Sequence, residues 1–404
     1  MFIFLGWVSI YSATYSDTEY EIFDFSTKYG KQFIWILLSF VLIIVILAID
    51  KKFYEQFSGV FYIVSILSLV GLFLFGKNIN GATSWYSFGS FAIQPAEFAK
   101  AATSLAIANY LNERNQDLRK LNNQLKAFGI ILLPALLITL QPDPGSALVY
   151  GSLILVLYRF GLPMYYLIIG LIATILFVST LYFGYINTLI LTLIIITILF
   201  FYLNYKNKNF IRDNWFKFLL LYFFTSLFIF SVDYVFNNVF EQRHRDRFNI
   251  LLGKDVDDQG IGYNTAQSVI TISSGGFNGK GFLQGDRTQG DFVPEQQTDY
   301  IFSSIGEEWG FLGSGFVILL FMAFLLRLLQ IADRQKSTFS KVYAYAIVAI
   351  FFFHFTINIG MVIGLLPTIG IPLPFFSYGG SSLWGFTVLL FILIRLDADR
   401  IYEW

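Results

Sequence analysis

The chain has 404 residues, of which 56% are hydrophobic, 19% aromatic and only 13% charged. Soluble domains carry about 25% charged residues, so this composition is typical of an integral membrane protein. Its formal net charge is zero, which does not indicate a nucleic-acid partner. The absence of cysteine excludes disulfides, thiolate catalysis and Cys-ligated metals. The two histidines, His244 and His354, lie far apart in sequence and do not favour a metal site.

Apolar runs that approach the roughly 20 residues needed for a membrane-spanning helix recur along the whole chain. There are about twelve: 1–13, 33–49, 60–75, 96–111, 127–140, 146–160, 163–183, 188–203, 218–235, 300–329, 342–366 and 382–396. The first is too short to span and lacks a basic segment before it, so it is a poor signal peptide. We expect the sequence to begin inside the true first helix, or a few residues to be missing before it. The predicted fold class is an all-α polytopic membrane protein.

Basic residues predict the orientation of these spans, because cytoplasmic connections are rich in Lys and Arg. With the N-terminus inside, the short outer connections hold only Lys28, Lys31 and Lys77, and the inner ones hold most of the other basic residues. An even number of spans returns the C-terminus to the inside. The outer segments are then 14–30, 77–94, 141–145, 237–299 and 367–380. They are rich in Gly, Pro, Gln, Asn and Ser, as loops that carry chemistry often are.

The long outer segment ends in FVPEQQTDYIFSSIGEEWGF (292–311), which places Asp299 where the chain enters a membrane helix. An ionisable group at such a boundary is costly unless it has an interaction partner or a functional role. One interpretation is a helix N-cap, because Thr298 or Asp299 directly precedes an apolar helix. The density of polar side chains at this point, including Glu295, favours a catalytic role instead.

The glycine-dense segment GGFNGKGFLQG (275–285) can present free backbone amides to an anion. It is not a Walker A loop, because Ser274 and Gly281 stand where Gly and Ser or Thr are needed. The alternative is a plain flexible loop. Lys280 and Arg287 are nevertheless well placed to meet a pyrophosphate.

Two shorter motifs carry charge next to an outer loop. In QPAEFAK, Glu97 and Lys100 are three residues apart on one helix face, which predicts an ion pair that holds the helices together. In QPDPGS, Asp143 lies in a tight turn and is a candidate cap for the next helix. The Pro/Gly-broken segment 366–382 is expected to line a cavity, because a broken backbone at membrane depth is tolerated only beside protein or water.

Five segments together resemble the SEDS family (shape, elongation, division and sporulation), in its rod-shape, RodA-like branch. They are 81–100, 141–149, 262–285, 292–311 and 358–382. The resemblance covers nearly all of 1–404 as a single membrane domain. It implies about ten family helices, to which 188–235 adds two inserted spans, and a large extracytoplasmic catalytic loop at 237–299. The chain departs from most relatives at Gln297, where they have His, and at Pro144, where Leu is common.

The resemblance implies an inverting peptidoglycan glycosyltransferase that polymerises lipid II during cell elongation, on the outer face of the bacterial cytoplasmic membrane. Lipid II is donor and acceptor, undecaprenyl pyrophosphate leaves, and a class B penicillin-binding protein is the partner. Asp299 matches the family's catalytic acid and is assigned as general base, with Glu97 and Lys100 as a supporting ion pair. No metal ligands stand out, and a Mg²⁺ or Mn²⁺ cofactor is left open. Candidates for contact with substrate or pyrophosphate are Lys280, Arg287, Asp143, Glu295 and Ser377.

Two other functions remain open at this point. Many spans, broken helices and intramembrane acids also suit a flippase for a lipid-linked precursor. A non-catalytic scaffold for the penicillin-binding protein would retain the fold without needing Asp299.

Overall fold

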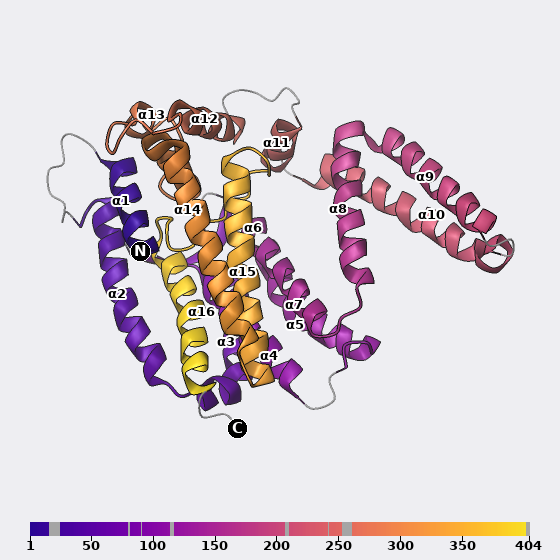
Figure 1. Cartoon of the computed structure of the whole chain (residues 1–404), viewed down its shortest axis with the longest axis horizontal. Helices are drawn as coiled ribbons and strands as arrows, with labels where there is room; N and C mark the ends of the chain where they lie inside the picture. The colour runs from indigo at the N-terminus through magenta and orange to yellow at the C-terminus, as the bar shows by residue number, and fades with distance from the viewer. Residues whose placement is uncertain are drawn as a thin grey trace. The chain divides into compact units, whose positions relative to one another are not determined.

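The computed structural model describes residues 1–15, 25–79, 81–89, 91–113, 117–206, 210–240, 242–252 and 261–400. These residues form two compact units, Met1–Pro163 with Asn264–Trp404, and Met164–Tyr263 (Figure 1). Within the described ranges, nine helices are long and apolar enough to cross a membrane. The protein is therefore a multi-pass, all-α membrane protein, as predicted.

Each of the twelve predicted runs overlaps a helix or a pair of consecutive helices. In the first unit these are α1 (Phe2–Thr14), α2 (Lys28–Ala48), α3 (Lys51–Phe75), α4 (Pro95–Asn112), α5 (Leu121–Thr139), α6 (Pro144–Val149) continued through a 3-10 turn by α7 (Leu153–Arg159), α14 (Ile301–Asp333), α15 (Thr338–Val362) and α16 (Gly380–Asp399).

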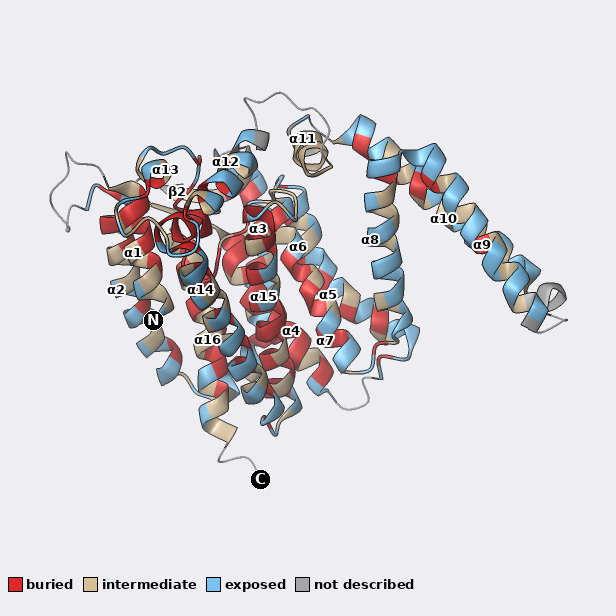
Figure 2. Cartoon of the chain, turned by 45° about the horizontal axis from the view of Figure 1, so that its top comes forward, coloured by how far each residue is buried: buried red, intermediate tan, exposed pale blue. Residues whose placement is uncertain are grey.

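Helices α4 and α15 form the buried centre of this unit, and Figure 2 shows buried residues concentrated on them. Helix α4 packs against α3, α15 and α16. Its sequence, rich in Ala, Ser and Thr, allows close helix contacts. Because other helices cover it, α4 does not need the lipid-facing apolar surface that marks the outer helices.

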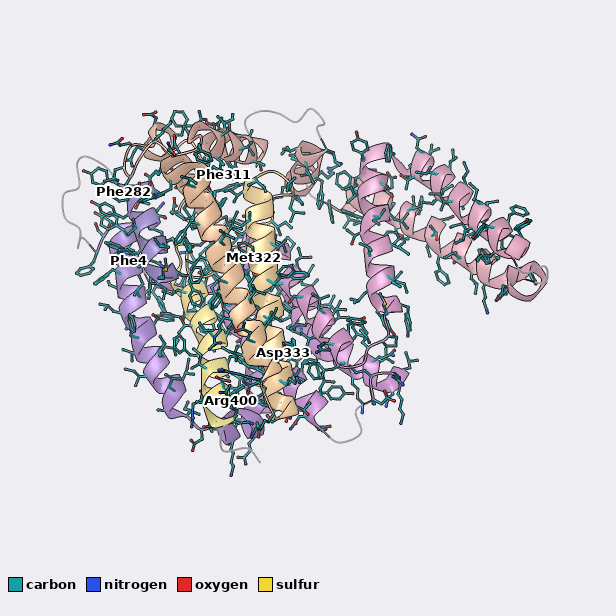
Figure 3. The ribbon with its side chains drawn as sticks, viewed as in Figure 1. Phe4, Phe282, Phe311, Met322, Asp333 and Arg400 are labelled. Atoms are coloured by element: carbon teal, nitrogen blue, oxygen red, sulfur yellow. The ribbon has the colours of Figure 1, made fainter. Side chains whose placement is uncertain are left out.

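The two ends of the first unit differ in character. One end carries the small antiparallel sheet β1 (Lys77–Ile79), β2 (Ala82–Phe88) and β3 (Phe91–Ile93), together with α12 (Ile261–Ser274) and α13 (Asp286–Gln289). No pattern in the sequence predicts this sheet. The opposite end carries ion pairs such as Arg395 with Asp50 at 2.8 Å. Figure 3 shows Phe282 and Phe311 at the loop end and Asp333 and Arg400 at the charged end.

The second unit contains α8 (Tyr165–Phe183), α9 (Tyr185–Lys206), α10 (Phe210–Tyr234), a π-helical turn (Val235–Val239) and α11 (Gln242–Leu251). Helices α9 and α10 pack against each other. Leu181, Val232 and Phe236 form a small core, and Phe248 of α11 packs against it. The two spans predicted within 188–235 correspond to α9 and α10, and their status as an insert stays a prediction.

Candidate functional site

Four polar segments from distant parts of the chain meet at the loop end of the first unit. We call them the four-loop cluster: the β1–β3 sheet with Gln94, and residues 141–146, 294–300 and 367–382. The hydrogen bonds that join them include Thr83 N to Gln141 O (3.2 Å), Gln94 N to Ser381 Oγ (3.1 Å) and Tyr378 N to Gln297 O (2.8 Å).

Asp299 lies in this cluster, partly exposed, two residues before α14 begins. The N-cap of α14 is Tyr300 and no side chain caps the helix, so the N-cap interpretation of Asp299 is not observed. The buried Asn358 of α15 donates from Nδ2 to Asp299 O at 2.8 Å and to Ile371 O at 2.7 Å. A Cβ on Gly370, whose φ is +79°, would lie 3.3 Å from Asp299 Oδ2. The carboxylate therefore lies against the backbone of the 367–382 segment.

The turn that contains Asp143 contacts the same backbone. Asp143 caps α6 by accepting from Ser146 N at 3.0 Å, and it also accepts from Gln94 Nε2 at 2.8 Å. A Cβ on Gly145 would lie only 2.7 Å from Ile369 O. Gly145 packs on Ile369, and the next residue, Gly370, lies beside Asp299. Ile369 and Gly370 therefore connect the turn containing Asp143 to the Asp299 loop.

Glu97 and Lys100 form a buried ion pair beneath the cluster, with Glu97 Oε2 and Lys100 Nζ 2.8 Å apart. Sequence reasoning missed its third member, His354 of α15. The Nε2 atom of His354 lies 3.0 Å from Lys100 Nζ, and Phe386 lies under the ammonium at 5.2 Å. No local pattern signals this contact, because 254 residues separate Lys100 from His354.

Removing one charge of this pair should destabilise the protein strongly. Breaking a buried pair leaves an uncompensated charge, which typically costs about 3–5 kcal/mol. We expect Glu97→Gln and Lys100→Met each to lower the unfolding free energy measured in detergent. The double variant should lose less than the sum of the two, because it buries no lone charge. Additive losses would contradict an energetic coupling between these side chains.

The glycine-rich segment is held by Glu307, a fully buried carboxylate of α14. Glu307 Oε1 accepts from Lys280 Nζ at 2.8 Å and Arg287 N at 3.1 Å, and Oε2 accepts from Thr288 N and Oγ1, both at 2.7 Å. The hydrogen bonds to Glu307 raise the pKa of Lys280 above its ordinary value, with a second contribution from Asp286. Glu307 therefore binds both Lys280 of the glycine-rich segment and the neighbouring helix α13.

Helix α14 is interrupted three residues further on, at Gly310, with φ +63° and ψ −158°. The freed backbone pairs with the glycine-rich segment: Phe311 N donates to Gly276 O at 3.0 Å and Gly281 N to Glu308 O at 2.9 Å. A Cβ on Gly310 would lie 2.3 Å from Gly279 N, so only glycine fits. The segment 275–285 is thus packed into the break of a membrane helix.

The remaining predicted contact residues also have protein partners. Arg287 donates to Thr271 Oγ1 at 3.2 Å and lies 5.0 Å from the Phe292 ring. Ser377 is buried, and its Oγ accepts from Leu373 N at 2.8 Å. Glu295 is exposed and accepts from Thr298 Oγ1 at 3.2 Å. Their roles toward a substrate stay predictions. Within the described ranges, no group of three or more His, Asp or Glu side chains could hold a metal ion.

Comparisons with known proteins agree with this architecture. A family model for FtsW, RodA and SpoVE, described as cell cycle protein, matches residues 1–211 and 186–402. The chain is 33% identical over 429 residues to the peptidoglycan glycosyltransferase RodA of Treponema pallidum (strain Nichols), across 98% of this chain and 95% of that protein. It is also 33% identical over 386 residues to the peptidoglycan glycosyltransferase MrdB of Escherichia coli (strain K12), across 95% of this chain and 88% of that protein.

Solved structures show the same fold. A chain from a peptidoglycan synthase complex, described as coordinating polymerization and crosslinking, matches with a TM-score of 0.72 and 24% identity, across 100% of this chain and 96% of that one. The rod shape determining protein RodA of Thermus thermophilus matches with a TM-score of 0.62 and 22% identity, across 99% and 94% of the two chains.

Proposed function

The chain belongs to the FtsW/RodA/SpoVE family, and we propose that it polymerises lipid II into glycan strands during cell elongation. The observation that carries this proposal is the position of Asp299. Asp299 is partly exposed at the mouth of α14, within the four-loop cluster. A headgroup can reach it there while the polyprenyl tail stays in the bilayer.

In the proposed reaction, Asp299 takes the proton from the C4 hydroxyl of the acceptor's N-acetylglucosamine. The oxygen attacks the anomeric carbon of the donor's N-acetylmuramic acid, and the bond to undecaprenyl pyrophosphate breaks with inversion to a β-1,4 linkage. The proton then passes from Asp299 to water. A positioned base of this kind contributes about 10²–10⁴ to the rate.

The departing pyrophosphate needs positive charge, and we assign this role to Lys280 and Arg287. Lys280 Nζ is 3.0 Å from Asp286 Oδ2, and the Asp286 side chain is 86% exposed. A pyrophosphate can displace this exposed partner while Glu307 keeps its contact with Lys280. A Mg²⁺ or Mn²⁺ ion bound to the pyrophosphate would add to the positive charge that Lys280 and Arg287 supply.

We further propose that the loop end faces outward from the bacterial cytoplasmic membrane and that both termini are cytoplasmic. The distribution of Lys and Arg between the two sets of connections supports this orientation. A class B penicillin-binding protein is the proposed partner, since a matching fold occurs in a complex that joins polymerization with crosslinking.

The proposal is tested by incubating the purified protein with lipid II in liposomes, alone and with the transpeptidase. We expect glycan polymer in at least one of the two reactions. Repeating both reactions with a metal chelator tests whether polymerisation needs a divalent cation. Movement of labelled lipid II across the bilayer without polymer would instead identify a flippase. Polymer in neither reaction, with a transpeptidase that still binds the protein, would identify a scaffold.

A further inference from the structure

His354 is buried to 1% relative exposure in the centre of the first unit, and the proposed reaction does not use it. Its two ring nitrogens face partners of opposite kind. Nδ1 lies 3.2 Å from the carbonyl oxygen of Pro372, which can only accept a hydrogen bond. Nε2 lies 3.0 Å from Lys100 Nζ, which as an ammonium can only donate. These contacts require a neutral imidazole with its proton on Nδ1.

The ring is also held from the side. Phe386 of α16 meets the imidazole edge to face, with ring centroids 4.8 Å apart and planes at 87°. The same phenyl ring lies 5.2 Å from Lys100 Nζ. His354 is therefore fixed between α4, α16 and the broken segment 367–379. It holds the backbone of that segment at a set position relative to the two helices.

That segment leads directly to the proposed base. Pro372 bonds to His354, and Ile371 bonds to Asn358, one helical turn after His354 on α15. The next residue towards the N-terminus, Gly370, lies beside the Asp299 carboxylate, because a Cβ added to it would be 3.3 Å from Asp299 Oδ2. Three successive residues of the segment are thus held between α15 and Asp299.

We propose that His354 is a positioning residue for Asp299. The Lys100 ammonium at Nε2 fixes the Nδ1–H tautomer, and the bond from Nδ1–H to the Pro372 carbonyl keeps Gly370 beside the carboxylate. This inference rests on the proposed function. A misplacement of about 1 Å at a reacting group can cost roughly 100-fold in rate, so losing the Pro372 bond should lower kcat about 10- to 100-fold.

The tautomer can be tested without any activity measurement. The chain contains two histidines, so ¹⁵N-histidine labelling gives two imidazoles, and a His244→Gln variant assigns them. At neutral pH we expect the His354 ring to be neutral with the proton on Nδ1. An imidazolium, or a proton on Nε2, would overturn the inference even if the enzyme polymerises lipid II.

A matched pair of variants tests the positioning role. In His354→Asn the amide nitrogen occupies the place of Nδ1 and can still donate to Pro372 O. In His354→Gln the amide oxygen occupies the place of Nε2 and can still accept from Lys100, but nothing bonds Pro372. We expect kcat to fall about 10- to 100-fold in the Gln variant and within about threefold in the Asn variant. The KM for lipid II and the melting temperatures of the two variants should be similar.

Equal activity of both variants, a larger loss in the Asn variant, or activity that simply follows melting temperature would overturn the positioning role. A failure of the proposed function would give different experimental results. In that case Asp299→Asn stays active, or the wild-type protein makes no polymer, whatever the state of His354.

Discussion

Replacing Asp299 with asparagine should lower the rate of lipid II polymerisation by about 10²–10⁴, the usual contribution of a positioned general base. Asparagine has nearly the same shape as aspartate but cannot accept the hydroxyl proton. The hydrogen bond from the Asn358 side chain reaches the backbone carbonyl of residue 299 and not its carboxylate, so it should persist in the variant. We therefore expect an inactive but folded protein, measured by polymer yield against melting temperature.

Asp291→Asn is the matched control for this change. Asp291 is an exposed aspartate in the same segment, eight residues before Asp299, and its φ of +51° is one that asparagine tolerates well. Its substitution should leave polymerisation unchanged. Asp299→Glu keeps a base but moves it towards Gly370, so we expect intermediate activity. Near-normal polymer yield in Asp299→Asn would remove this carboxylate from the mechanism.

Local features of the sequence are enough to predict the helices and part of the site. Long apolar runs depend only on neighbouring residues, so the twelve predicted runs overlap the observed helices. The pairing of Glu97 with Lys100 follows from a spacing of three on one helix. Asp299 stands out because a polar stretch meets an apolar run at that point.

Features that depend on tertiary contacts were not predicted. The break of α14 at Gly310 lies inside one predicted span without proline, and the 276–281 backbone packs against it. Lys280 and Arg287 looked available in the sequence, but folding gives them Glu307 and Thr271 as partners. His354 reaches Lys100 only because α15 packs on α4.

Replacing Glu307 with glutamine should loosen α13 and the Lys280 side chain from α14. The carboxylate accepts from Lys280, from Arg287 N and from both donors of Thr288. A glutamine amide would point its own donors at some of these groups and leave the ammonium without its buried counter-charge. An unsatisfied buried group costs about 1–3 kcal/mol, and more if it is charged. We expect a lower melting temperature and polymerisation reduced at least about tenfold.

Hydrogen exchange separates this local effect from general destabilisation. The amides of Arg287 and Thr288 bond to the Glu307 side chain, whereas the amide of Lys280 bonds to its backbone carbonyl at 3.0 Å. In Glu307→Gln we expect faster exchange at residues 287 and 288 before any loss at 280. Glu308→Gln is the control, because its carboxylate accepts from Leu283 N and from Ser12 of α1 and touches neither amide. Unchanged exchange at 287 and 288 would show that the Glu307 carboxylate does not hold α13, since it is the acceptor of both amides in the folded protein.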